Sequence, residues 1–217
     1  NLLFMGQEFA QANEWNFKTG LDWDLLENTD NKTMLQFSEK LNKFYLENSP
    51  LWANDDSWDG FSWIANDDSK QSVIAFRRID DKGQELVVVC NFVPVERKDY
   101  KIGVPIYGKY ELVFNSDDKQ FGGSGLADTT YKTSETSMHG FDQCISLDLA
   151  PLSVMYLKGT AEPKPKKTTV KTTTKTVKKS TTSKSKSTNT ETSKSSTSVK
   201  SKSSSSKSSS KDKSSDK

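Results

Sequence analysis

The chain has 217 residues, and its formal net charge of +2 hides two oppositely charged parts. The last 57 residues contain 16 Lys and four acidic residues, whereas the first 160 contain 15 basic and 25 acidic residues. The overall charge is therefore no evidence for a nucleic-acid or membrane partner. Most of the last part is Lys, Ser or Thr, which cannot build a core, so we expect residues 160–217 to form a disordered tail. This part has no aromatic residue or Arg for stacking or base reading, and no nucleic-acid partner is expected.

Cysteine and histidine are too few for a disulfide framework or a metal site. Cys90 and Cys144 lie in apolar runs, which is typical of buried thiols in a reducing compartment, and His139 is the sole histidine. We therefore expect no metal, no cofactor and a cytoplasmic location. No apolar run approaches the ~20 residues of a membrane-spanning helix, so no membrane partner is expected.

The first residues predict a buried strand followed by a functional loop. Leu2–Met5 is an unbroken apolar run, which is typical of a parallel strand buried on both faces, and Gly6 ends it. Polar and aromatic residues follow, at the end of the strand where barrel and doubly wound folds place their functional groups. No later segment offers parallel neighbours, and the chain starts inside the run. We therefore expect this strand to be the last of a larger parallel sheet, and the chain to be the C-terminal part of a longer protein.

A long loop and one helix are predicted next. Residues 6–33 show no persistent hydrophobic period, and a loop of this length is usually functional. From Thr33 to Asn48, apolar residues recur at three- and four-residue steps, which predicts a helix that packs on a core. Thr33 is the expected N-cap, and Ser49-Pro50 ends the helix. The apolar stripe consists of Met34, Phe37, Leu41, Phe44 and Tyr45.

The rest of the body is predicted to be mostly β. After a second loop at residues 51–59, the pattern changes to period two with β-branched and aromatic residues. The predicted strands are residues 61–65, 72–79, 85–93, 99–104, 109–115, 143–149 and 153–157. Short strands with turns between them predict an antiparallel β-sandwich, here over residues 51–159. Residues 122–140 are expected to form a long, mobile excursion.

Two sets of residues that suggest catalytic or phosphate-binding motifs are interpreted as structural. Adjacent acids occur at residues 55–56, 67–68, 80–81 and 117–118. A catalytic carboxylate pair must converge across roughly 5–10 Å, whereas neighbours in a turn diverge into water, so all four pairs are interpreted as solvated turns. The glycines at 122, 123 and 125 lack the strand–loop–helix setting and the Lys of a phosphate loop.

Tryptophans and carboxylates in the two loops are the candidates for ligand binding. A sugar ring stacks its apolar face on an indole while its hydroxyls bond to acids and amides, so this combination suits a carbohydrate. For any single Trp, structural packing is an equal alternative. All five tryptophans fall in the first 63 residues: Trp15, Trp23, Trp52, Trp58 and Trp63.

Ordered motifs extend along residues 1 to about 158. They include Leu2-Leu-Phe-Met-Gly-Gln-Glu-Phe-Ala-Gln11, Leu21-Asp-Trp-Asp-Leu-Leu-Glu27, Gly60-Phe-Ser-Trp-Ile64 and Val88-Val-Cys-Asn-Phe-Val-Pro-Val95. In these motifs and their order, the chain closely resembles the bacterial glycogen branching enzymes (1,4-α-glucan branching enzymes). These belong to the α-amylase superfamily, glycoside hydrolase family thirteen. The Lys/Ser/Thr tail lies outside the resemblance.

The resemblance implies a (β/α)8 barrel followed by a C-terminal all-β domain. Residues 1–50 would then be the last strand, active-site loop and last helix of the barrel. These enzymes cleave an α-1,4-glucan and reattach the piece through an α-1,6 bond, with retention, using an Asp nucleophile, a Glu acid/base and a second Asp. The resemblance places those carboxylates on earlier barrel strands, so no catalytic residue is assigned here. This chain alone is expected to be inactive.

The resemblance also implies four substrate-binding residues for an α-glucan or glycogen partner. Glu8, Trp15 and Trp23 match positions beside the glucan-binding cleft; bracing of the barrel rim is the alternative. Trp63 is expected to be a surface glucan platform, with interdomain packing as the alternative. The expected state is a monomer. The alternative function is a stand-alone carbohydrate-binding β-sandwich module with a basic tail, for which the opening buried strand is not needed.

Overall fold

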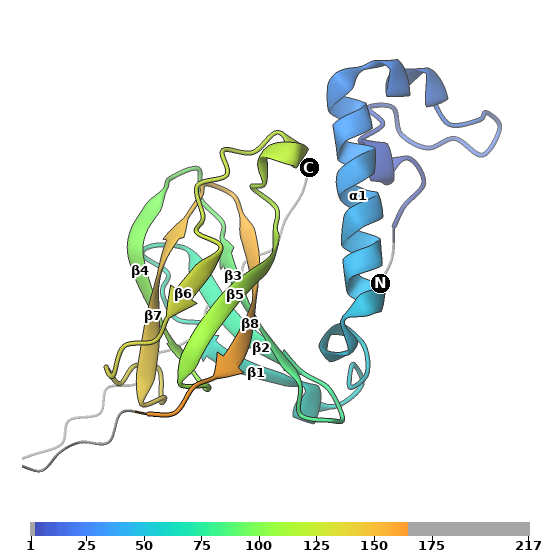
Figure 1. Ribbon diagram of the computed structural model, residues 1–217. Coiled ribbons are helices and arrows are strands. Elements are labelled where there is room, and N and C mark those ends of the chain that lie inside the picture. The colour runs from blue at the N-terminus through green and yellow to red at the C-terminus, as the bar shows by residue number, and fades with distance from the viewer. Residues whose placement is uncertain (1–2, 165–217) are drawn as a thin grey trace, which may run out of the picture. The chain divides into compact units, whose positions relative to one another are not determined.

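The computed structural model describes residues 3–164, which contain one α-helix and eight β-strands (Figure 1). Residues 165–217, which make up nearly all of the predicted disordered tail, lie outside the described residues. The elements are η1 (Gln7–Phe9), η2 (Trp23–Glu27), α1 (Thr29–Glu47), η3 (Ser49–Leu51), η4 (Trp58–Gly60), β1 (Phe61–Ala65), β2 (Val73–Ile79), β3 (Glu85–Asn91), β4 (Arg97–Val104), β5 (Gly108–Asn115), η5 (Lys119–Phe121), β6 (Thr130–Lys132), β7 (Gln143–Leu149) and β8 (Val154–Ala161).

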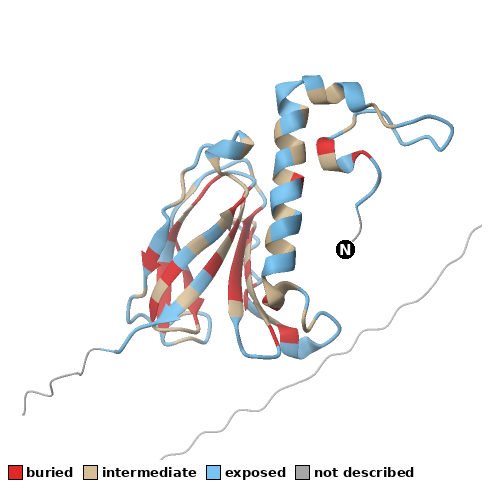
Figure 2. Ribbon diagram, turned by 45° about the vertical axis from the view of Figure 1, so that its right-hand side comes forward, coloured by how far each residue is buried: buried red, intermediate tan, exposed pale blue. Residues whose placement is uncertain are grey.

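The strands form two antiparallel sheets, which confirms the predicted mostly β, antiparallel architecture. One sheet has the order β1-β2-β3-β8-β5-β6, and β4 and β7 form the other. Alternate residues of each strand point between the sheets and build the core, and Figure 2 shows the buried residues gathered on the strands. Fully buried core residues include Val87, Val89, Ile102, Leu147 and Leu157. The strand that sequence reasoning missed, β6, lies inside the predicted excursion and has three residues with a single apolar side chain, Tyr131.

The other face of the large sheet carries a continuous row of large side chains. The register places each member opposite the next on the neighbouring strand, from β1 to β5. We call this the outer-face row: Trp63, Phe76, Val88, Tyr156 and Phe114. A row of directly opposed aromatic and β-branched residues stabilises strand pairing. It also leaves an apolar face that must be covered by another element or occupied by a binding partner.

The helix α1 covers one end of the outer-face row. The Phe44 ring lies 5.0 Å from Phe114 and 5.2 Å from Tyr156, centroid to centroid, and Phe37 lies 6.0 Å from Phe114. The predicted apolar stripe therefore packs on the sheet as expected. The helix starts at Thr29, with Asn28 in the N-cap position, and not at Thr33. Its first turn is polar, so the hydrophobic period could not reveal it.

The structure describes no strand at Leu3–Met5, and the expectation that Leu2–Met5 is the last strand of a barrel in a longer protein stays a prediction. Residues 3–5 have no strand structure, and the side chains of Leu3, Phe4 and Met5 are about half exposed. A parallel strand needs hydrogen-bonded neighbours on both sides. All strand pairs among residues 3–164 are antiparallel, and none includes this segment. The apolar run therefore has no sheet to join.

Candidate functional site

The predicted binding residues lie in two separate places, and Glu8 belongs to the first. The Glu8 carboxylate accepts a hydrogen bond from the backbone amide of Gly6 at 3.0 Å. The backbone carbonyl oxygen of Glu8 accepts a hydrogen bond from the Ser38 hydroxyl of α1 at 2.9 Å. The backbone of η1 is thus fixed to the helix, while one carboxylate oxygen of Glu8 serves the local turn.

The first place also contains Trp15 and Trp23. Trp15 meets the Phe4 ring edge-on at 5.7 Å, and Trp23 lies 5.1 Å from the buried ring of Phe9. Both indoles keep a substantial exposed surface. Each tryptophan therefore has a structural partner and a free surface. No ring contact among the described residues joins either of them to Trp63.

Trp63 lies in the second place, at the end of the outer-face row that α1 leaves open. Its ring meets Phe61 at 4.8 Å and 89°, and Phe76 at 6.0 Å and 82°. Trp58, on η4, meets the same Phe61 ring at 6.4 Å and 68°. Phe61 is therefore flanked by two indoles. Trp58 is 84% exposed and Trp63 is 48% exposed.

An ion pair holds the loop that carries Trp58. The guanidinium of Arg78, on β2, donates a hydrogen bond of 2.8 Å to the Asp55 carboxylate. It also donates to the carbonyl oxygens of Pro50 and Leu51, at 3.3 and 3.4 Å. A guanidinium that donates to three acceptors fixes geometry as well as charge. Arg78 therefore ties residues 50–55 to the large sheet.

These residues line an open pocket of about 470 Å³, which we call the tryptophan pocket. It is lined by Asp55, Trp58, Phe61, Trp63 and Arg78, among others. Large exposed apolar surface in a folded domain usually marks an interaction site. Aromatic walls with a few fixed polar groups suit a ligand that has apolar faces and polar edges, and a sugar ring has both.

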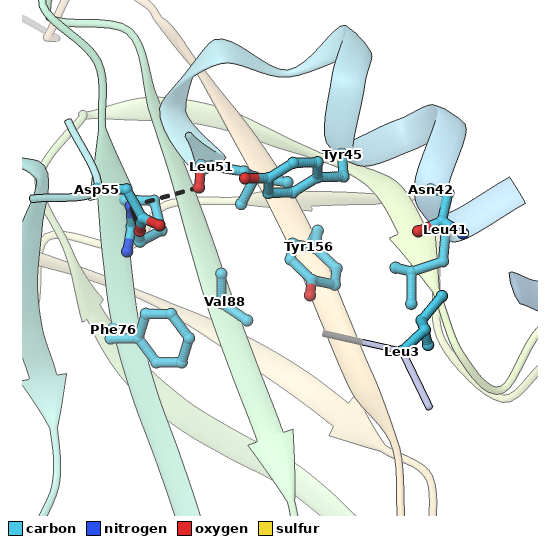
Figure 3. Close-up of a pocket in the computed structure, with 10 residues that line it drawn as sticks. Leu3, Leu41, Asn42, Tyr45, Leu51, Asp55, Phe76, Val88 and Tyr156 are labelled. Atoms are coloured by element: carbon cyan, nitrogen blue, oxygen red, sulfur yellow. Dashed lines mark hydrogen bonds and ion pairs between the residues drawn. The ribbon is translucent and has the colours of Figure 1, made fainter. Parts of the chain in front are cut away.

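A second pocket, of about 590 Å³, lies between α1 and the large sheet (Figure 3). Phe76, Val88 and Tyr156 line its sheet side, and Tyr45 of α1 lies on the other side. Burial raises the pKa of the Tyr156 hydroxyl, so this side chain stays neutral at ordinary pH. Asp55 and Arg78 line both pockets. Their ion pair therefore marks the boundary between the part of the outer-face row that α1 covers and the open part at Trp63.

Sequence reasoning placed Trp63 correctly in β1 but did not assign the residues around it. The sequence analysis grouped Trp58 with the other loop tryptophans. Its spacing of five residues from Trp63 was the one signal that the two could lie in the same pocket. The ring contact between Phe61 and Phe76 depends on the register of β1 and β2, which the residue pattern alone does not give. Asp55, interpreted as a solvated turn residue, is the ion-pair partner of Arg78.

Further acids that were interpreted as solvated turns are held by hydrogen bonds, among them Asp80 and Asp117. Asp80 is only 3% exposed and accepts bonds from the Ser49 hydroxyl and the amides of Lys82 and Gln84. Burial alone would raise the pKa of Asp80, but these bonds outweigh it, so the pKa lies below its usual value. Asp117 binds Ser124 and the two amides after it, and its pKa is lowered in the same way.

Residues 3–164 contain no group of three or more His, Cys, Asp or Glu side chains placed to hold a metal ion. Within the same residues, no helix is both long and apolar enough to span a bilayer.

Comparison with known proteins agrees with the fold and with the motifs. Residues 63–160 match the family described as "Alpha amylase, C-terminal all-beta domain". The chain is 44% identical over 158 residues to the 1,4-alpha-glucan branching enzyme GlgB of Prochlorococcus marinus, covering 72% of this chain and 21% of that protein. It is 43% and 45% identical to the enzymes of the same name from Halothermothrix orenii and Francisella philomiragia, covering 72% of this chain and 25% of each of them.

Residues 63–160 are therefore similar to the C-terminal all-β domain of the α-amylases. Over 72% of its length, the chain is related to the 1,4-alpha-glucan branching enzymes and corresponds to their C-terminal part. The chain spans about a fifth to a quarter of the length of these relatives.

Proposed function

We propose that this chain is the C-terminal, glucan-binding part of a 1,4-α-glucan branching enzyme. Such an enzyme transfers a cleaved α-1,4-glucan segment to form an α-1,6 branch. In this proposal the β-sandwich holds the glucan at a distance from the reaction, and the 217-residue chain alone performs no transfer. The relationship to proteins named as branching enzymes supports the parent activity.

The observation that carries the binding proposal is the open end of the outer-face row. The helix α1 packs on Phe114 and Tyr156 and leaves Trp63 uncovered at the far end. A row built only for packing would not leave its indole half exposed beside a second, more exposed one. Stacking of a sugar ring on Trp63 would bury this surface and satisfy the sugar's apolar face.

Sedimentation with glycogen tests the proposal on the full 217-residue chain. We expect the chain to pellet with glycogen in an ultracentrifuge, and Trp63→Ala to reduce the pelleted fraction severalfold. Trp52→Ala is the matched control, because Trp52 is 45% exposed but does not line the tryptophan pocket. A wild-type chain that stays in solution, or a Trp63→Ala variant that pellets as well as wild type, would contradict the proposal.

We further propose that Glu8, Trp15 and Trp23 shape glucan subsites at the rim of the catalytic barrel in the parent enzyme. Their partly exposed side chains and the attachment of η1 to α1 support this proposal. The test is the parent enzyme with Trp15→Ala or Trp23→Ala. If these tryptophans form subsites, their replacement should raise KM or shorten the transferred chains. If they only brace the rim, their replacement should lower stability without changing the product pattern.

The alternative function is a stand-alone carbohydrate-binding β-sandwich module. The tryptophan pocket favours it, because the lining residues all come from the β1–β2 region and the preceding loop. Reading the genomic frame upstream of Asn1 separates the two functions. Further barrel strands with Asp and Glu at their ends support the branching enzyme, and a Met codon directly before Asn1 supports the module.

We also propose a cytoplasmic location and a monomeric state. Cys90 and Cys144 are free and buried, and burial raises the pKa of the Cys90 thiol to about 11. Buried free thiols are typical of proteins from a reducing compartment. Cell fractionation and light scattering of the purified chain test these two points, and a periplasmic fraction or the mass of a dimer would contradict them.

A further inference from the structure

A corner of the sandwich, where β3 ends and β8 begins, exposes large apolar side chains. We call residues 91–95 and 150–153 the apolar corner. Phe92 is 58% exposed, Val95 is 50% exposed and Leu152 is 67% exposed. Single exposed apolar residues are ordinary on a protein surface, but several on two joined segments mark an interaction surface. We propose that the apolar corner docks against the part of the parent enzyme that precedes this chain, an inference that rests on the proposed function.

Hydrogen bonds join the two segments of the apolar corner. The side-chain amide of Asn91, a buried residue, donates to the carbonyl oxygens of Val95 at 2.9 Å and Ala150 at 2.8 Å. The backbone amide of Leu152 donates to the carbonyl oxygen of Val93 at 3.0 Å. A surface that is fixed before it binds loses little conformational entropy when it docks. The corner is therefore preorganised for a contact.

Leu152 has a strained backbone conformation and gains no burial in this chain. Its φ of 49° lies in the left-handed region, where a bulky residue is an outlier. Ser72, whose carbonyl oxygen accepts a hydrogen bond from the amide of Phe92 at 3.0 Å, has a positive φ of 53° as well. Such strain is concentrated at functional sites. Because Leu152 is mostly exposed here, burial against a docked partner would offset the strain that its own domain leaves uncompensated.

The charges beside the apolar corner favour an uncharged, apolar partner surface. Glu96 and Lys98, which follow Val95, pair with each other at 3.3 Å. The guanidinium of Arg97, between them, donates to the carbonyl oxygen of Gln71 at 3.2 Å. These charged groups are therefore directed to partners within the sandwich.

The size of the apolar corner favours a part of the same polypeptide over a separate protein or a second copy. A few partly exposed side chains offer far less than the roughly 800 Å² that each partner buries in a stable complex. A preceding domain needs no such area, because covalent linkage makes its docking intramolecular. The relatives are long enough to supply one, since this chain spans only 21% to 25% of their length.

Hydroxyl-radical footprinting tests the docking, because the radical labels exposed side chains. The two samples are the 217-residue chain and the parent enzyme made from its complete reading frame. We expect the labelling of Phe92 and Leu152 to fall about fivefold in the parent enzyme, since side chains at the centre of an interface lose nearly all their exposed surface. His139 is the matched control, because it is exposed at the opposite end of β7, and its labelling should be equal in both samples.

A substitution gives a second readout that a purely local role of Leu152 would not produce. Leu152→Asn relieves the strain, because Asn tolerates the left-handed conformation. The melting temperature of the 217-residue chain should stay the same or rise, whereas that of the parent enzyme should fall by roughly 2–4 °C. His139→Asn, at another exposed residue of positive φ, is the control and should shift both melting temperatures equally.

The outcomes separate this inference from the proposed function. If Phe92 and Leu152 are labelled equally in both samples while the parent enzyme forms branches, only the docking is wrong. If labelling falls in the 217-residue chain alone as its concentration rises, the apolar corner binds a second copy and the docking is again wrong. Equal losses of melting temperature for Leu152→Asn in both samples would show that Leu152 serves only the sandwich. A complete reading frame that encodes no branching enzyme would overturn both proposals.

Discussion

Replacing Asp80 should destabilise the domain strongly, because its buried carboxylate joins α1 to the sandwich. The carboxylate accepts a hydrogen bond of 2.5 Å from the hydroxyl of Ser49, directly after the helix. It also accepts bonds of 2.9 and 2.7 Å from the amides of Lys82 and Gln84 in the β2–β3 turn. Asp80→Ala leaves all three donors without this partner.

The magnitude follows from the strength of these bonds. Hydrogen bonds to charged groups contribute about 1.5–3 kcal/mol each, but water reaches a turn and rehydrates part of the freed donors. We therefore expect Asp80→Ala to lower the free energy of unfolding by about 3 kcal/mol, and Ser49→Ala by about 1 kcal/mol. The matched control is Asp81→Ala in the same turn, whose exposed side chain should contribute less than about 0.5 kcal/mol.

Urea denaturation of the 217-residue chain, followed by circular dichroism, measures these differences. The effect should also depend on pH. The pKa of Asp80 is lower in the folded chain than in the unfolded chain, so the unfolded chain binds more protons as the pH falls below about 4. The contribution of Asp80 is complete above that pH and is lost below it, so wild type and Asp80→Ala should converge in acid. A loss below 1 kcal/mol at pH 7, equal to that of Asp81→Ala, would refute the reasoning.

Three further changes test other parts of the fold. Asp117→Asn should lower the free energy of unfolding by about 1–2 kcal/mol at pH 7, with the difference shrinking below pH 4 because the pKa of Asp117 is lowered; a difference that grows in acid would contradict this. Phe44→Ala removes a ring packed on the sheet and should lose about 2–3 kcal/mol in urea denaturation, whereas the exposed Leu46→Ala should lose almost nothing; equal losses would show that α1 does not pack on the sandwich. Gly103→Ala places a Cβ atom 2.0 Å from a backbone oxygen and should lower the melting temperature by several degrees, and an unchanged value would contradict that close approach.

Much of the β-sandwich could be predicted because its strands alternate between core and outer face. The pattern at residues 85–93 and 143–149 fixed strand positions to within about two residues, as β3 and β7 show. The same local pattern could not give the order of the strands, since β8 lies between β3 and β5. That order depends on contacts between residues far apart in the sequence.

The site shows the same limit more clearly. The residue pattern placed Trp63 in a strand, as β1 shows, because its motif is local. It could not bring Phe76 opposite Trp63 or Arg78 to Asp55, because both contacts depend on the register of β1 and β2 and on the folded loop. The opening run at Leu3–Met5 forms no strand within residues 3–164 for a related reason. A pattern predicts that a strand can form, but only paired neighbours make it form.

The indole N–H signals of the five tryptophans offer the most direct measurement of glucan binding. Each Trp gives one signal in a proton–nitrogen correlation spectrum, and Trp→Phe variants assign the five signals. The account predicts that, as maltoheptaose is added, the signals of Trp58 and Trp63 shift together along one binding curve while that of Trp52 stays in place. Unchanged Trp58 and Trp63 signals at saturating sugar, or equal shifts of all five, would contradict it.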